Sequence, residues 1–353
     1  MLYFRLKQVN VFTLFPILFI AARIQPSIAG HMDITIAYFH PLLHPDVVKQ
    51  DFDQIRATGA GSILYAIHEQ EEQRLQRDLE RGLRQAQDAG LKVHVSLGRH
   101  GNLFAGPLFV PSWYTFRHPQ SRVMDRHGRY HEISCFNHQS FRSWLFKEIE
   151  HYLTSYPING ILIDEPRGLE VTCFCSVCRA LCPDVTDIQR FRRRSMIEFL
   201  SELCACVKRV DSNIKTTIAL LPQDMSQVED IATIPQLDTI GCHLFWNMLN
   251  EDVTLVEQWG RNVVEIAHQQ GKRSQIWLQN FNLDGDSQKQ LDSAFVQVQS
   301  VEPDELGCYY FWRNNANPAQ VWQMTQAYLR RIPRRQLYWQ VNSPGQPGIE
   351  QAS

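Results

Sequence analysis

Two adjacent carboxylates, Asp164 and Glu165, end an apolar segment that begins at Gly160, and Pro166 follows them directly. The apolar run is typical of a parallel strand buried on both faces, and proline ends it because proline cannot donate to the ladder. Carboxylates at the carboxyl end of such a strand stand where α/β proteins form their sites. Because two neighbouring negative charges raise one of the two pKa values, the pair suits general acid catalysis near neutral pH.

The alternation of side chains along a strand makes a prediction about this pair. Glu165 would share one face with Ile161 and Ile163, and Asp164 would share the other face with Leu162. The alternative is an acid pair in the first turn of a helix, which is common. No helical pattern starts until well after these residues, so we favour the strand end.

Thiols flank this strand in the sequence at a spacing typical of a metal site. Cys173, Cys175 and Cys178 form a Cys-x-Cys-x-x-Cys motif, and tetrahedral zinc needs a fourth ligand. Cys182 is a nearby candidate for it. Cys135 is the other candidate, because loops after adjacent strands lie side by side whatever the sequence gap. Disulfides or buried apolar cysteines are the alternative, but the density of thiols indicates a metal.

Strand-like and helix-like segments alternate along residues 33–335, which would position these groups. The expected strands are residues 34–39, 62–67, 92–97, 160–164, 215–221, 239–245, 275–278 and 307–311. The clearest segments of helical period are residues 47–58, 72–89, 141–155, 187–209, 253–270, 288–298 and 318–331. Strand followed by helix, repeated in this way, predicts a single-domain (β/α)8 TIM barrel. An open doubly wound sheet is less favoured, because no glycine-rich phosphate turn follows the first strand.

Composition and the chain ends set further limits. The 353 residues are 44% hydrophobic with a net charge of −2, which gives no indication of a nucleic-acid partner. Residues 1–29 resemble a secretory signal peptide that is too short for a stable membrane span. Processing of this segment implies a secreted or periplasmic protein, whereas a true start at Met32 implies a cytoplasmic one. Residues 342–353 are rich in Pro, Gly and Gln and predict a flexible tail.

Polar and aromatic residues follow the expected strands and nominate a substrate site. The stretch from residue 98 to residue 134 has no period, and Arg99, His100 and Trp113 within it suit sugar binding. A loop packed on itself is the alternative. Further candidates for substrate contacts at the strand ends are His243, Trp246, Asn280, Trp312 and Arg313. A catalytic zinc held by His40, His44 or His243 is a less favoured hypothesis.

Residues 135–182 resemble the zinc-containing β-galactosidases of glycoside hydrolase family 42. The resemblance rests on a cysteine, a helix-like segment, an acid-ending strand and a Cys-x-Cys-x-x-Cys loop at residues 173–182, in that order. It implies a (β/α)8 barrel, a carbohydrate substrate and an acid/base at Glu165. It also implies that a structural zinc is bound by Cys135, Cys173, Cys175 and Cys178.

Two departures from that family leave three hypotheses open. The family has Asn-Glu where this chain has Asp164-Glu165, and its nucleophilic Glu at the end of the seventh strand has no counterpart here. First, Glu165 could work with another carboxylate, for which the candidates are Asp284, Glu69 and Asp224. Second, the pair could resemble hexosaminidases, in which the acetamido group of the substrate is the nucleophile. Third, the barrel could bind glycans without cleaving them.

Overall fold

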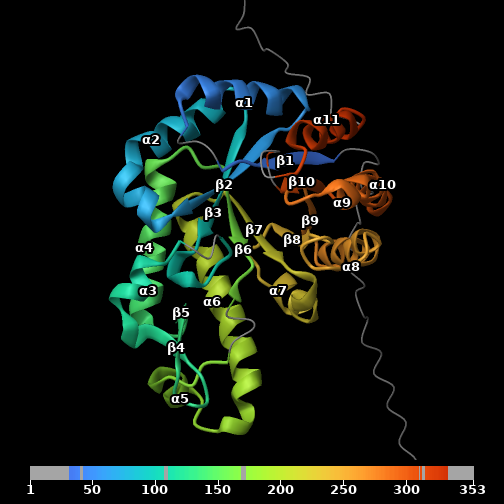
Figure 1. Cartoon of the computed structure of the whole chain (residues 1–353). Helices are drawn as coiled ribbons and strands as arrows, with labels where there is room; N and C mark the ends of the chain where they lie inside the picture. The colour runs from blue at the N-terminus through green and yellow to red at the C-terminus, as the bar shows by residue number, and fades with distance from the viewer. Residues whose placement is uncertain are drawn as a thin grey trace, which may run out of the picture.

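The structure is a computed structural model that describes residues 32–39, 43–106, 110–167, 172–309, 311 and 315–332. Parallel strands close into an eight-stranded barrel in the order β1-β10-β9-β8-β7-β6-β3-β2. Helices surround this barrel (Figure 1). The predicted single-domain (β/α)8 fold is therefore confirmed. The signal-like segment 1–29 and the tail 342–353 lie outside the described residues.

The bounds of the elements agree with the predicted segments to within a few residues. The barrel strands are β1 (Asp33–Ala37), β2 (Ser62–His68), β3 (Lys92–Gly98), β6 (Gly160–Asp164), β7 (Lys215–Leu220), β8 (Thr239–Leu244), β9 (Arg273–Gln279) and β10 (Glu305–Tyr309). The longer helices are α1 (Pro45–Ala57), α2 (Glu69–Asp88), α4 (Gln139–Ser155), α6 (Ile188–Val210), α8 (Leu255–Gln269), α10 (Leu291–Val301) and α11 (Pro318–Leu329). Both β9 and β10 begin two residues before the predicted segments. The prediction started too late because each strand opens with a charged residue, Arg273 or Glu305, which does not extend an apolar run.

Short helices complete the connections. They are α3 (Trp113–Arg117), α5 (Ser176–Leu181), α7 (Val228–Ala232) and α9 (Gly285–Lys289). The connection between β7 and β8 contains a 3-10 helix at Pro222–Gln227 and the five-residue α7. Among the described residues, no helix is both long and apolar enough to cross a membrane.

Side-chain alternation divides the buried residues between the barrel interior and the layer under the helices. Leu64 and Leu162 pack with Trp277 inside the barrel, whereas Ile63 and Ile163 belong to the larger outer core. The interior requires a glycine beside the indole. A Cβ atom on Gly307 would lie 2.2 Å from the Trp277 ring, so no larger residue fits there without displacing it.

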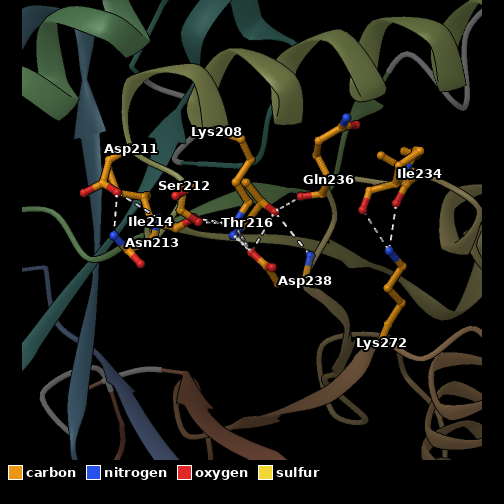
Figure 2. A network of polar contacts seen from close by, with 11 residues as sticks. Lys208, Asp211, Ser212, Asn213, Ile214, Thr216, Ile234, Gln236, Asp238 and Lys272 are labelled. Atoms are coloured by element: carbon orange, nitrogen blue, oxygen red, sulfur yellow. Dashed lines mark hydrogen bonds and ion pairs between the residues drawn. The ribbon is translucent and has the colours of Figure 1, made fainter.

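A polar network holds the amino-terminal ends of the strands (Figure 2). Asp238 accepts hydrogen bonds from Lys208 Nζ at 2.6 Å and from the Thr216 amide at 2.8 Å. Burial alone would raise the pKa of Asp238, but these donors lower it. The network ties the end of α6 to the starts of β7 and β8, at the barrel face that serves stability.

The long connection after β3 has a structure that the sequence pattern did not predict. It contains α3 and an antiparallel hairpin of β4 (Arg122–Met124) and β5 (Tyr130–Ser134). β4 has only three residues, and β5 has a single buried residue, so neither shows the apolar run that marks the barrel strands. The Tyr114 ring in α3 stacks on Trp144 of α4 with centroids 4.4 Å apart. The segment is therefore packed on the barrel as a small substructure.

Candidate active site

A cavity of about 750 Å³ opens at the carboxyl ends of the barrel strands. Its wall includes residues at or after the end of every barrel strand, from Phe39 after β1 to Tyr309 at the end of β10. Asp164 and Glu165 both line it. The sequence therefore located the correct face of the barrel, which is where (β/α)8 enzymes place their active sites.

Asp164 and Glu165 meet at one buried imidazole. Nδ1 of His243 lies 2.7 Å from Oε1 of Glu165, and its Nε2 lies 3.5 Å from Oδ1 of Asp164. The side chain of Glu165 is 16% exposed, against 5% for Asp164 and 1% for His243. Glu165 is thus the group of this cluster that a molecule in the cavity can reach most easily.

The backbone explains how two adjacent carboxylates reach the same imidazole. β6 ends at Asp164, and Glu165 adopts a φ of +42°, in the left-handed region. Strand alternation therefore does not extend to Glu165, although the sequence pattern predicted that it would. A residue with a Cβ atom at positive φ stores strain, which proteins tolerate mainly at functional positions.

The pKa values of Asp164 and His243 are both raised in the cluster. Burial raises the pKa of Asp164 to about 7, an effect that the His243 charge opposes and the Glu165 charge reinforces. Burial alone would lower the pKa of His243, but the two carboxylates outweigh it and raise that pKa. The sequence predicted that one carboxyl of the pair would have a raised pKa, and burial, more than the neighbouring charge, is the main cause.

Aromatic rings form another part of the cavity wall. The Tyr309 ring lies 5.4 Å from Phe39, 5.1 Å from Phe245 and 5.6 Å from Phe281, centroid to centroid. All four residues line the cavity. Each stands at the end of a different strand and belongs to no motif, so the sequence pattern did not single them out. Such a wall suits the apolar face of a pyranose ring.

A third carboxylate in the cavity wall, Glu71, was also missed. It lies in the first turn of α2, three residues after β2 ends at His68. Its Oε2 accepts hydrogen bonds from the Tyr65 hydroxyl at 2.8 Å and from Nδ1 of His68 at 3.0 Å. The capping-box spacing from His68 to Glu71 was the available sequence signal, but it indicates a helix start and not a site.

The other predicted carboxylates serve the scaffold. Glu69 accepts bonds from the amides of Gly101 and Tyr114 and from the Ser112 hydroxyl, and burial raises its pKa. It thereby anchors the connection after β3. Asp284 caps α9 through the amides of Asp286 and Ser287, which lower its pKa. Asp224 is buried in a turn after β7. None of these three predicted acids lines the described cavity.

The predicted sugar contacts in the connection after β3 also lie away from the cavity wall. Arg99 donates from Nε to the carbonyl of Val110 at 3.3 Å. His100 is fully buried with Nε2 2.7 Å from the Tyr152 hydroxyl, and burial lowers its pKa to about 3. Trp113 is held by the guanidinium groups of Arg74 and Arg117. These interactions favour the alternative of a self-packed connection.

The remaining predicted contacts divide into buried and undescribed residues. Trp246 is buried in the outer core, and Asn280 accepts a 2.9 Å bond from the Thr325 hydroxyl. His44 caps α1, so the structure does not bring it to His243 as the catalytic-zinc hypothesis required. Trp312, Arg313 and His40 lie outside the described residues.

Four buried thiols form a separate cluster. The Sγ atoms of Cys135, Cys173, Cys175 and Cys178 lie within 4.8 Å of one another. Sγ of Cys135 is 3.5 Å from that of Cys178 and 3.9 Å from that of Cys175. Four thiolates about 2.3 Å from one zinc ion would be roughly 3.8 Å apart, whereas a disulfide needs about 2.05 Å. This donor set therefore fits a tetrahedral metal such as zinc.

The thiol cluster connects two loops that are distant in sequence. Cys135 follows β5, and the other three precede or begin α5, which lies near the hairpin in Figure 1. Val123, Ile188 and Phe191 pack around the sulfur atoms. Of the two candidates for the fourth ligand, the structure places Cys135 in the cluster. Cys182 lies outside it and donates to the Asp184 carbonyl.

Comparison with solved structures places the barrel among those of glycosidases. The chain superposes on the β-galactosidase of the haloarchaeon Halorubrum lacusprofundi with a TM-score of 0.65 and 12% sequence identity. The superposition covers 84% of this chain. Superposition on the β-galactosidase of Marinomonas ef1 gives a TM-score of 0.63 with 10% sequence identity and covers 84% of this chain. Superposition on the endo-1,4-β-mannanase of Rhizomucor miehei gives a TM-score of 0.61 with 12% sequence identity. It covers 85% of this chain and 95% of the mannanase. The chain shares its (β/α)8 barrel fold with these glycosidases.

The similarity is one of fold. The chain spans 57% and 59% of the lengths of the two β-galactosidases. No protein-family model matches it, and no curated protein matches it in sequence. The expected resemblance to β-galactosidase barrels is confirmed at this level.

Proposed function

We propose that this chain is a glycoside hydrolase that cleaves a glycosidic bond in an oligo- or polysaccharide. The observation that carries the proposal is the cluster in which Asp164 and Glu165, from the cavity wall, meet the buried imidazole of His243. It places two groups with raised pKa values beside Glu165, which is the most exposed member of the cluster. Hydrolysis of a glycoside needs such a proton donor, because the departing sugar oxygen is a poor leaving group until it is protonated.

Glu165 is the general acid/base in this proposal. A pyranose ring stacks on the wall formed by Phe39, Phe245, Phe281 and Tyr309, which leaves its glycosidic oxygen to the carboxyl groups. Glu165 donates a proton to that oxygen, the bond from C1 to the oxygen breaks, and the leaving sugar departs as an alcohol. Nδ1 of protonated His243 returns the proton to Glu165, and Asp164 keeps a further proton in the cluster.

We also propose that zinc is the metal at the thiol cluster. Cys135, Cys173, Cys175 and Cys178 would hold it and complete its coordination, which leaves no position for a substrate. The ion would cross-link the connection after β3 to the loop before α5. Its role is therefore structural.

A non-catalytic carbohydrate-binding barrel is the second candidate. The observation that favours it is the use of Asp284, the first carboxylate after β9, as the cap of α9. A nucleophile is thus missing from the position where the resembling family has one.

Release of reducing sugar from a broad panel of oligosaccharides and aryl glycosides tests the proposal. Wild type is compared with Glu165→Gln and with Glu198→Gln, an isosteric control at an exposed position on α6. We expect release by wild type and by the control. Glu165→Gln should be about 10²–10⁴-fold slower, because that is the usual contribution of a general acid. Tight glycan binding without release by folded wild type would instead identify the binding barrel.

A further inference from the structure

We infer that Glu71 is the second catalytic carboxylate and acts as the general base in an inverting hydrolysis. The inference rests on the proposed function, because it assigns the partner of Glu165 at the same site. Glu71 lines the cavity together with Asp164 and Glu165. Neither the sequence pattern nor the resemblance to β-galactosidases pointed to it.

The place of Glu71 in the barrel separates it from Glu165 by two strand spacings. Glu71 follows β2 and Glu165 follows β6, and β3 lies between these two strands. Neighbouring strands are roughly 4.8 Å apart, so the two strand ends are separated by roughly 10 Å. Inverting glycosidases hold their carboxyl groups about 6.5–9.5 Å apart, because a water molecule must fit between the base and the sugar. Retaining enzymes need a closer pair.

The hydrogen bonds of Glu71 fix one oxygen and leave the other available. Oε2 accepts from the Tyr65 hydroxyl at 2.8 Å, from Nδ1 of His68 at 3.0 Å and from the His68 amide at 3.3 Å. Within the described part of the chain, Oε1 has no hydrogen-bond partner. The side chain is 24% exposed. A carboxylate oriented in this way can accept a proton from water through its second oxygen.

The residues around Glu71 are themselves held in place. Burial, and then the charge of Glu71, raises the pKa of Tyr65 well above its usual value, so the phenol remains a donor. His68 packs against Gly98, where a Cβ atom would lie 2.8 Å from Nε2 of the imidazole. This packing restricts the imidazole that supports Glu71. Tyr65 and His68 are thus positioning residues.

The other candidate acids are already engaged. Both oxygens of Glu69 accept bonds from the connection after β3. Oδ1 of Asp284 accepts from two amides and a hydroxyl in α9. Among the described residues of the cavity wall, Glu71 is the carboxylate that stands apart from the Asp164–Glu165 pair.

The step balances with water as the only co-reactant. Glu165 gives its proton to the glycosidic oxygen as the bond from that oxygen to C1 breaks. The water oxygen forms a new bond to C1 on the opposite face, and its proton passes to Glu71. The products are the leaving alcohol and a sugar of inverted anomeric configuration. His243 then returns a proton to Glu165, and exchange with solvent removes the proton from Glu71 and restores the one on His243.

The test uses the full chain and the substrate that wild type cleaves in the panel. Glu71→Gln is compared with wild type and with Glu80→Gln, an isosteric change on α2 at a side chain that pairs with Arg84. Glutamine at position 71 preserves the capping box of α2, so the fold should persist. We expect kcat of Glu71→Gln to fall about 10²–10⁴-fold with the control unchanged. Added azide should restore turnover and give the inverted glycosyl azide.

Two further measurements make the role of Glu71 specific. Proton NMR of the wild-type reaction should show the inverted anomer first. Tyr65→Phe should lower kcat more than it changes KM. This variant retains the Glu71 side chain and serves if Glu71→Gln does not fold.

Several results would overturn the inference. If Glu71→Gln works within about tenfold of wild type, the proposed function stands and the role of Glu71 fails. A retained anomer excludes the base role. Cleavage restricted to N-acetylated sugars by an active Glu71→Gln would identify the substrate acetamido group as the nucleophile. Absence of release by wild type would defeat both proposals together.

Discussion

Nδ1 of His243 on β8 lies 2.7 Å from Oε1 of Glu165 across 78 positions of sequence. The contact depends on the positive φ of Glu165, because a residue that continued the strand would alternate away from Asp164. β8 and β6 are separated in the barrel by β7, so the imidazole reaches the carboxylates across the barrel interior. The cluster therefore depends on closure of the barrel.

Replacement of His243 by asparagine should lower kcat about 10- to 100-fold and leave KM nearly unchanged, because His243 orients Glu165 and supplies its proton. The charge of His243 opposes the rise in the pKa of Asp164. Its loss should therefore raise the pKa of Asp164 further and change the pH dependence of kcat. Steady-state kinetics between pH 4 and pH 9 measure both effects. An unchanged profile would show that the contact has no role in catalysis.

Asp164→Asn should alter how stability depends on pH. The folded-state pKa of about 7 lies above the ordinary value of 3.8, so ionisation opposes folding. The contribution of Asp164 to the free energy of unfolding of wild type therefore falls as pH rises from about 4 to about 7. The asparagine variant has no such ionisation at this position. The free energy of unfolding of the variant, relative to wild type, should increase over this range. Urea unfolding at several pH values measures it, and a constant difference would contradict the buried acid.

Cys175→Ser should reduce both metal content and thermal stability, because it removes one of four ligands from the thiol cluster. Cys182→Ser is the matched control, since Cys182 is also buried in the same segment but lies outside the cluster. Elemental analysis and thermal melts with and without a chelator provide the measurements. A wild-type protein that is free of metal and equally stable with chelator would refute the zinc site.

Asp284→Ala should separate the scaffold role of this residue from the catalytic role considered from the sequence. Loss of the α9 cap should lower Tm, because two amides lose their acceptor. Substrate turnover at low temperature should not change, since Asp284 does not line the described cavity. Asp284→Asn, which can still cap the helix, is the control and should recover most of the lost Tm. A large fall in kcat in both variants would return Asp284 to the list of catalytic acids.

Local sequence patterns were sufficient for the barrel and for the two strongest motifs. Apolar runs and helical periods depend on neighbouring residues alone, so they predicted the strands and placed Asp164 and Glu165 at a strand end. The spacing of Cys173, Cys175 and Cys178, which is typical of metal ligands, is likewise a local property of the sequence. The hairpin of β4 and β5 was missed because β4 has three residues and β5 is mostly not buried, so neither carries an apolar run.

Contacts between distant segments decided the rest. The sequence left Cys135 and Cys182 as alternatives for the fourth thiol, and only the packing of the hairpin against the loop before α5 chose Cys135. The sequence also proposed Glu69 and Asp284 as acids, because a carboxylate after a strand looks the same whether it faces the cavity or caps a helix. The structure distinguishes these cases: the connection after β3 engages Glu69 and the first turn of α9 engages Asp284, whereas one oxygen of Glu71 stays available. The strand-end chemistry was thus encoded locally, whereas closure of the barrel determined which side chains share one cavity.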